Sequence, residues 1–114
     1  MGQDRQALSE QVFHILLSLV DGPMHGYGVI QQVERRTDGR LTLGSGTLYS
    51  AIKRMLRSGW VEETAVLDPE DPRRRYYRLT AEGRDIVRAE ARRLEELVHH
   101  ARAKAVLGGA GRRA

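Results

Sequence analysis

The chain has 114 residues, 40% of them hydrophobic, which is enough for one domain with a buried core and requires no second folded domain. It contains no cysteine, so disulfides, thiolate catalysis and thiolate metal sites are excluded. The net charge of +4 favours polyanionic partners such as nucleic acid, although an excess of this size is also common in small domains.

Neither a membrane span nor an export signal is predicted. The longest apolar run, residues 15–20, is interrupted by Ser18 and is too short to cross a bilayer. The N-terminal residues lack a basic segment followed by an apolar core. We therefore expect a cytoplasmic protein with no membrane partner.

The first predicted helix begins at Ser9, a favourable N-cap, and runs to about Val20, after polar residues 1–8 that are expected to be loose. Its apolar arc is wide, because Phe13 and Leu17 extend the stripe formed by its other apolar residues. A helix with such an arc is expected to pack against two surfaces. A second subunit is a natural candidate for one of them.

A second helix and a connecting segment are predicted next. Residues 24–28 lead into a helix that ends near residues 37–39, where a Thr-Asp-Gly turn stops it. The strand-like residues 41–43 then precede a third helix over residues 44–60, which opens on a glycine-serine turn.

The third helix has an apolar face and a basic face when its residues are spaced at 100°. The apolar face, typical of packing on a core, consists of Leu48, Ala51, Ile52, Met55 and Leu56. The opposite face consists of Gly46, Ser50, Lys53, Arg54 and Arg57. Its small residues let the backbone approach a groove wall, and its cations supply donors for phosphates or guanine edges. Taken alone, such a face is more often simply solvated.

A hairpin is predicted after the third helix. Residues 60–67 and 74–79 read as its two strands, with Tyr77 and Leu79 on one face and Trp60 in the core. Residues 68–72 contain two prolines, which cannot donate ladder hydrogen bonds, so an open loop is predicted there.

Arg73, Arg74 and Arg75 follow the predicted loop as a compact cationic cluster on a projecting hairpin. Three helices followed by such a hairpin predict a mainly α fold with a small β-hairpin, the winged helix-turn-helix.

A last helix is predicted from the cap Thr80 to about Leu107. Alternating spacings of four and three residues give it an a/d seam, widened by Leu97 and formed by Val87, Ala91, Leu94, Val98, Ala101 and Ala105. The seam requires another helix. Outside it, arginines on one face and glutamates elsewhere, Glu90 among them, predict a solvent-exposed flank.

Three motifs together make the chain resemble the PadR family of bacterial transcriptional regulators, in particular its short members with a single C-terminal helix. The first motif is LLSLVDGPMHGYG at residues 16–28, the second is GTLY at residues 46–49, and the third is RRYYRLTAEG at residues 74–83. Their order and spacing are specific, and the resemblance covers roughly residues 9–107.

The resemblance implies a homodimeric repressor of a nearby promoter that binds double-stranded DNA at an inverted-repeat operator, and that joins the nucleoid when bound. It implies a DNA-binding winged domain over residues 1–80, a dimerisation helix over residues 81–107, and a flexible tail over residues 108–114. The third helix would enter the major groove, the hairpin arginines would lie at the minor groove or backbone, and the last helix would pair with the first at the dimer interface.

Particular residues follow from this placement. The candidates for base-edge and phosphate contacts in the third helix are Thr47, Tyr49, Ser50, Lys53 and Arg54, with His25 and Tyr27 as phosphate partners and Arg73, Arg74 and Arg75 in the wing. The dimer-interface candidates are Phe13, Leu17, Val87, Ala91, Leu94, Val98 and Ala101. For Tyr27 and Tyr49, packing between helices is an equally good interpretation.

The sequence does not determine whether the protein binds a small-molecule effector. Some small relatives hold flat molecules between aromatic rings at the dimer centre, but the last helix here contains no Trp, Tyr or Phe. Phe13 is the one aromatic residue placed to line that centre, so a ligand site there would be mostly aliphatic. Phenolic acids, drugs and no ligand are all compatible with the sequence.

Two other classes are less favoured. No glycine-rich phosphate loop, paired-carboxylate setting or Ser/His/Asp arrangement indicates an enzyme, and the four histidines lack zinc spacing, so we expect no catalysis, cofactor or metal. The stronger rival is a winged-helix module that binds a protein through the seam and lacks DNA specificity.

Overall fold

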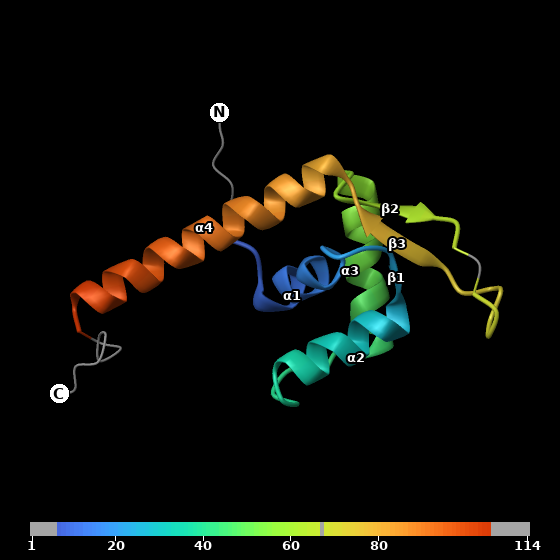
Figure 1. Cartoon of the computed structure of the whole chain (residues 1–114), viewed down its shortest axis with the longest axis horizontal. Helices are drawn as coiled ribbons and strands as arrows, with labels where there is room; N and C mark the ends of the chain where they lie inside the picture. Colours follow the sequence, from blue (N-terminus) through green and yellow to red (C-terminus); the bar gives the residue numbers. More distant parts are fainter. Residues whose placement is uncertain (1–6, 67, 106–114) are drawn as a thin grey trace.

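The computed structural model describes residues 7–66 and 68–105, and its elements follow the predicted order with one addition (Figure 1). They are α1 (Glu10–Ser18), β1 (Met24–His25), α2 (Gly26–Arg36), α3 (Ser45–Ser58), β2 (Val61–Thr64), β3 (Tyr76–Leu79) and α4 (Ala81–Ala103). The predicted tail and the end of the last helix at Leu107 lie outside the described residues, as does most of the predicted loose N-terminal segment.

The predicted helix caps at Ser9 and Thr80 are confirmed. Ser9 Oγ accepts from the N–H of Val12, and Thr80 Oγ1 accepts from the N–H of Gly83, each serving a donor that the first helical turn leaves free. The first helix is shorter than predicted. The N–H groups of Leu19 and Val20 bond to carbonyls three residues back, so the chain tightens into a turn before Val20.

The sheet has three antiparallel strands in the order β1–β3–β2, one more than the predicted hairpin. The extra strand is β1, whose Met24 and His25 pair with Tyr77 and Tyr76. The strand-like stretch 41–43 was the wrong candidate. It has no strand partner and serves as a connector, in which the N–H of Leu41 donates to Thr37 Oγ1.

The two predicted hairpin strands are shorter than expected, because residues 65–66 and 68–75 belong to neither strand; we call these described residues the wing loop. On β3, Tyr77 and Leu79 are buried on one face, as predicted. Trp60 is only partly buried, because it lies at the margin of the core against α1, α3 and α4. The core comes from all three short helices, the sheet and the first turns of α4.

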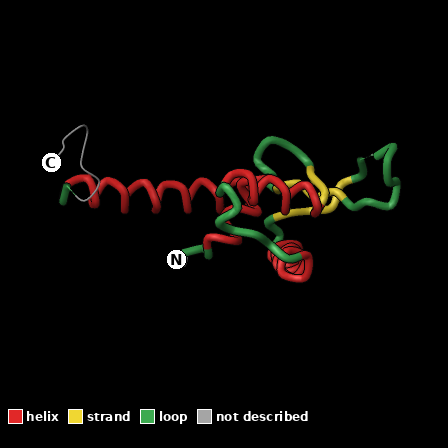
Figure 2. The backbone as a smooth tube through the Cα atoms, turned by 90° about the horizontal axis from the view of Figure 1, so that it is seen from below, coloured by secondary structure: helices red, strands yellow, loops and turns green. Residues whose placement is uncertain are grey.

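Helix α4 has 23 residues, about 34 Å at 1.5 Å per residue, and only its first turns pack on α1 and β3. Gly83 lies directly against the chain at Trp60, since an added Cβ would come within 2.0 Å of the Trp60 carbonyl oxygen. Figures 1 and 2 show the outer part of α4 and the wing loop extending from opposite ends of the body. On that outer part Leu97 is 52% exposed and Val98 41%.

Glu90 departs from the predicted solvent-exposed flank, because it is buried at the inner side of α4. Its carboxylate accepts two hydrogen bonds from the Arg93 guanidinium, at 3.0 and 2.6 Å. These bonds, together with one from the backbone N–H of Leu8, lower the pKa of Glu90 below its ordinary value of 4.5, against the opposing effect of burial. Glu90 thereby ties the segment before α1 to α4.

We expect Glu90→Gln to lower the free energy of unfolding by about 1–2 kcal/mol at neutral pH, because it weakens a charged hydrogen-bond pair. The folded-state pKa is depressed, so this stability is present above 4.5 and is lost as the pH falls through the lower folded value. Thermal unfolding followed by circular dichroism should therefore show a gap between the two proteins that narrows in acid. Exposed Glu96, changed to Gln, is the matched control.

Candidate nucleic-acid interface

Helix α3 presents its predicted faces to the core and to solvent. Leu48, Ala51, Ile52 and Met55 are buried, whereas Leu56, expected on the same face, is partly exposed because it lies at the edge of that arc. The whole opposite face is exposed, with Gly46, Thr47, Ser50, Lys53, Arg54 and Arg57. Gly59, at φ +79°, ends the helix in the left-handed conformation that glycine tolerates best.

No acidic group compensates the charge of this face. Helix α3 contains no Asp or Glu, and within residues 7–66 and 68–105 no carboxylate comes within ion-pair distance of its three cations, Lys53, Arg54 and Arg57. Elsewhere many arginines are paired, for example Arg78 with Glu62 at 2.7 Å. The outer face of α3 therefore keeps its full donor capacity for an anionic partner.

The side chain of Tyr49 extends from α3 onto the start of α2, although its ring stays largely exposed. Its hydroxyl lies directly over Gly26, where an added Cβ would come within 2.2 Å of the oxygen. Tyr27 is still more exposed, and its ring lies parallel to that of His25 with centroids 6.5 Å apart. Both tyrosines thus combine packing with an exposed edge.

His25 is the N-cap of α2, because its Nδ1 accepts from the N–H of Gly28 at 3.0 Å. Neutral His25 therefore carries its proton on Nε2, which makes that nitrogen a donor. Arg74 Nη1, also a donor, lies 3.2 Å from Nε2. Because both groups are donors, a single acceptor within reach of both would satisfy them, and a phosphate oxygen is such an acceptor.

The three wing arginines lie in different environments. The Arg73 side chain is 93% exposed, and Arg75 is also largely exposed, 3.6 Å from Glu63. Arg74 is only 33% exposed, since its guanidinium is directed inward to Asp68 and lies near Asp71. The sequence pattern predicts one cluster of three arginines and gives no role to Asp68, because Asp68 belongs to the predicted open loop that contains Pro69 and Pro72.

The predicted DNA-binding residues line two clefts. The first, about 440 Å³, lies between the start of α2 and the wing, and is lined by His25, Tyr27, Tyr49, Arg73, Arg74 and Arg75 among others. The second, about 450 Å³, lies between α1 and α3, and includes Thr47, Ser50 and Arg54. Lys53 lies on the exposed face of α3 outside both clefts.

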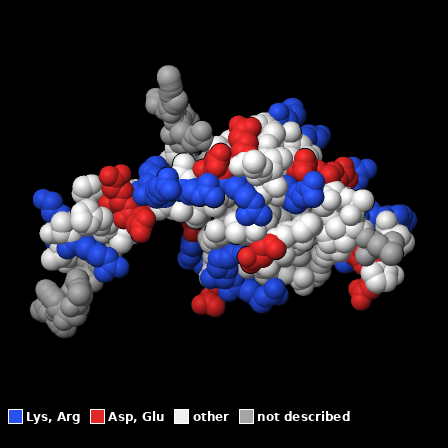
Figure 3. Space-filling view, turned by 45° about the horizontal axis from the view of Figure 1, so that its top comes forward, with Lys and Arg blue, Asp and Glu red and all other residues white. Residues whose placement is uncertain are grey.

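The predicted dimer-interface residues lie on α1 and along one side of α4. Phe13 and Leu17 are half-buried on α1, and on α4 Val87, Leu94 and Ala101 are half-buried while Ala91 and Val98 are exposed. Figure 3 shows a row of basic side chains over the inner part of α4 and acidic side chains further out.

Within residues 7–66 and 68–105, no three His, Asp or Glu side chains come together as a group of metal ligands. In the same part of the chain, every helix lacks the combination of length and apolar character that a bilayer crossing demands.

The sequence matches the profile of the Transcriptional regulator PadR-like family over residues 15–89. Transcriptional regulator Rv3488 of Mycobacterium tuberculosis is 36% identical over 97 residues, which are 84% of this chain and 81% of that protein. An uncharacterised 37.1 kDa protein in a Streptomyces fradiae transposon is 34% identical over 85 residues, 73% of this chain, but the chain spans only 22% of its length.

Two solved structures share the fold. A PadR family transcription regulator of Clostridium difficile superposes with a TM-score of 0.69 at 26% identity, covering 81% of this chain and 94% of that one. Bacillus subtilis PadR, solved in complex with operator DNA, superposes with a TM-score of 0.61 at 16% identity, covering 69% of this chain and 45% of that one. The family profile covers well over half of the sequence, and the fold is a winged helix, so this chain belongs to the PadR-like family of transcriptional regulators.

Proposed function

We propose that the protein is a homodimeric, sequence-specific DNA-binding repressor that acts on a nearby promoter through an inverted-repeat operator. The observation that carries the proposal is the outer face of α3, which is exposed, rich in donors and free of acidic residues. In a winged helix this face is the one that enters the major groove. The proposal assigns the protein no enzymatic activity.

The arrangement of the two clefts supports this assignment. Base edges would be contacted by Lys53, Thr47 and Ser50. Phosphates on either side would be contacted by His25 and the wing arginines. Bacillus subtilis PadR, solved in complex with operator DNA, has the same fold, which supports DNA binding by this chain. Residues 1–80 would then form the DNA-binding part.

Residues 81–107 would form the dimerisation helix in this proposal. The inner seam residue Val87 packs on the core of the subunit, whereas the outer part of α4 leaves Leu97 and Val98 exposed and open to a second subunit. A two-fold dimer formed through α1 and α4 would place two copies of α3 about 34 Å apart, so the operator half-sites would be about one DNA turn apart.

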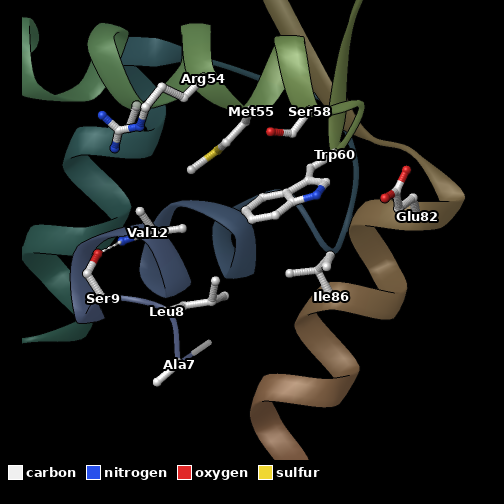
Figure 4. A pocket seen from close by; sticks show the side chains of 11 residues that line it. Ala7, Leu8, Ser9, Val12, Arg54, Met55, Ser58, Trp60, Glu82 and Ile86 are labelled. Atoms are coloured by element: carbon white, nitrogen blue, oxygen red, sulfur yellow. Dashed lines mark hydrogen bonds between the residues drawn. The ribbon is translucent and has the colours of Figure 1, made fainter. Parts of the chain in front are cut away.

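An open pocket in one subunit offers a place for a small-molecule effector in this proposal. The pocket is about 710 Å³ and lies between α1, α3 and α4, with Trp60, Met55, Val12 and Ile86 among its walls (Figure 4). Arg54 lines this pocket and also the cleft beside the outer face of α3. A ligand there would therefore act on a proposed DNA contact.

Fluorescence anisotropy tests the proposal, with labelled duplex from the region upstream of the gene, a scrambled duplex, and a titration at several salt concentrations. We expect the upstream duplex to be preferred by about a hundredfold or more, and affinity to fall steeply as salt displaces the phosphate contacts. Weak and equal binding to the upstream and scrambled duplexes, and to a random duplex library, would contradict the proposal and favour a protein-binding module.

A further inference from the structure

The wing loop has no apolar anchor among its described residues. In residues 65–66 and 68–75 every side chain is exposed or half-buried except Asp68, which is 7% exposed. Val66 is partly exposed, and the two prolines of the loop lie at the surface. Among these described residues, the contacts that hold the loop in place are therefore polar.

Asp68 makes those contacts, to three parts of the chain. Its Oδ1 accepts from the N–H of Glu70 at 2.9 Å, and its Oδ2 accepts from Tyr76 Oη at 3.0 Å and from Arg74 Nη1 at 3.4 Å. We call Asp68, Arg74 and Tyr76 the wing-base cluster. The hydrogen bonds, first that from Glu70, lower the pKa of Asp68, so the carboxylate stays ionised at neutral pH.

The wing-base cluster joins the wing loop to the sheet and to the start of α2. Tyr76 belongs to β3 and pairs with His25 of β1, and the rings of these two residues meet edge to face at 5.3 Å. Arg74 lies between Asp68 and His25, 3.2 Å from the histidine. The position of the loop is thus set relative to His25, which caps α2.

The exposed arginines flank the residue that the cluster holds. Arg73 and Arg75 are neighbours of Arg74 in the chain, and both side chains are largely exposed, with Arg73 3.8 Å from Asp71 and Arg75 3.6 Å from Glu63. Fixing the Arg74 side chain inward fixes the backbone from which the other two project. Without that fixation, the ordering of the loop would have to occur on binding, at an entropic cost.

We infer that Asp68 is a positioning residue for DNA binding, which holds the wing through Arg74 and Tyr76 so that Arg73 and Arg75 face the DNA backbone. The inference rests on the proposed DNA-binding function and adds a role for a residue that does not contact DNA itself. Arg74 then has two roles, because it is the partner of Asp68 and also lies beside His25, where both side chains can reach a phosphate.

Asp68→Asn tests this inference, because two physical expectations have opposite signs. If Asp68 acted only through its charge, removing a negative charge near the phosphates would tighten DNA binding. If Asp68 positions the wing, binding should weaken, by about fivefold to twentyfold for the loss of part of two phosphate contacts. Affinity would be measured by anisotropy on the tightest duplex that the wild-type protein selects from a random library.

Two further variants keep the test decisive. Glu70 is exposed and lies two residues after Asp68, so Glu70→Gln removes the same charge without touching the wing-base cluster. DNA affinity should then be unchanged or slightly higher. Tyr76→Phe removes only the hydroxyl donor to Asp68 without a change of charge, and should weaken binding in the same direction as Asp68→Asn, whether or not Asp68→Asn folds.

The effect of Asp68→Asn should disappear in an Arg73→Ala/Arg75→Ala background, because the wing then lacks the two exposed arginines that Asp68 is inferred to position. Equal losses in both backgrounds, or tighter binding by Asp68→Asn and unchanged binding by Tyr76→Phe, would overturn the inference while wild-type binding upholds the proposed function. A wild-type protein that selects no duplex would instead remove the proposed function, and the inference with it.

Discussion

If the proposed dimer forms through the seam on α4, replacing Leu94 with aspartate is expected to make the protein monomeric at micromolar concentration. Leu94 lies half-buried in the middle of the seam on α4, between Ala91 and Val98. In a two-fold dimer each interface residue occurs twice, so the change would bury two unpaired carboxylates. Each costs several kcal/mol, which raises the dimer dissociation constant by about a thousandfold or more.

Loss of the dimer should also weaken DNA binding by about a hundredfold, because the two α3 helices would no longer be linked at the spacing of one DNA turn. Sedimentation equilibrium gives the assembly state, and anisotropy gives the affinity. Circular dichroism verifies that the helices persist in the monomer.

Ala89→Asp is the matched control for Leu94→Asp. Ala89 lies on the same helix, is exposed, and points about 200° away from Val87 at 100° per residue, opposite to the seam. The same charge at this position should leave the dimer intact. A Leu94→Asp variant that remains dimeric, or an Ala89→Asp variant that dissociates equally, would contradict an interface along the seam.

The elements that sequence reasoning found are those with a strong local signal. Helix α3 has a complete apolar stripe, a glycine stop and no competing pattern, and Ser9 and Thr80 are caps whose chemistry is local. Strand β1 lacks such a signal. Two residues have no periodicity, and Met24 and His25 become a strand only because β3 pairs with them from more than fifty residues away.

In the candidate site, too, features with a local sequence signal could be predicted and features that depend on distant contacts could not. The exposed face of α3 follows from helical periodicity, so its donors could be assigned from sequence. The contact of Arg74 with Asp68 could not be predicted from sequence, because it depends on how the irregular segment that contains Pro69 and Pro72 folds back. Helical periodicity likewise does not predict the burial of Glu90, whose contact with Leu8 in the segment before α1 joins residues distant in the sequence.

The largest effect on DNA binding is expected from Lys53→Ala combined with Arg54→Ala. Both side chains project from the acid-free outer face of α3, and Arg54 also lines the cleft toward α1. A single contact to a base edge or phosphate contributes about 1–3 kcal/mol, so losing two should reduce affinity by about a hundredfold or more. Anisotropy on the preferred and scrambled duplexes measures the loss.

The salt dependence of the Lys53→Ala/Arg54→Ala variant distinguishes the two kinds of contact. If both residues bind phosphates, the slope of log affinity against log salt should fall by about two units, with weakening on every duplex. If they read bases, the slope should change little and the preference for the selected duplex should collapse. Arg102→Ala/Lys104→Ala removes the same charges, one arginine and one lysine, from exposed positions at the far end of α4. Equal losses in the two double variants would mean that only net charge matters, and would contradict recognition by α3.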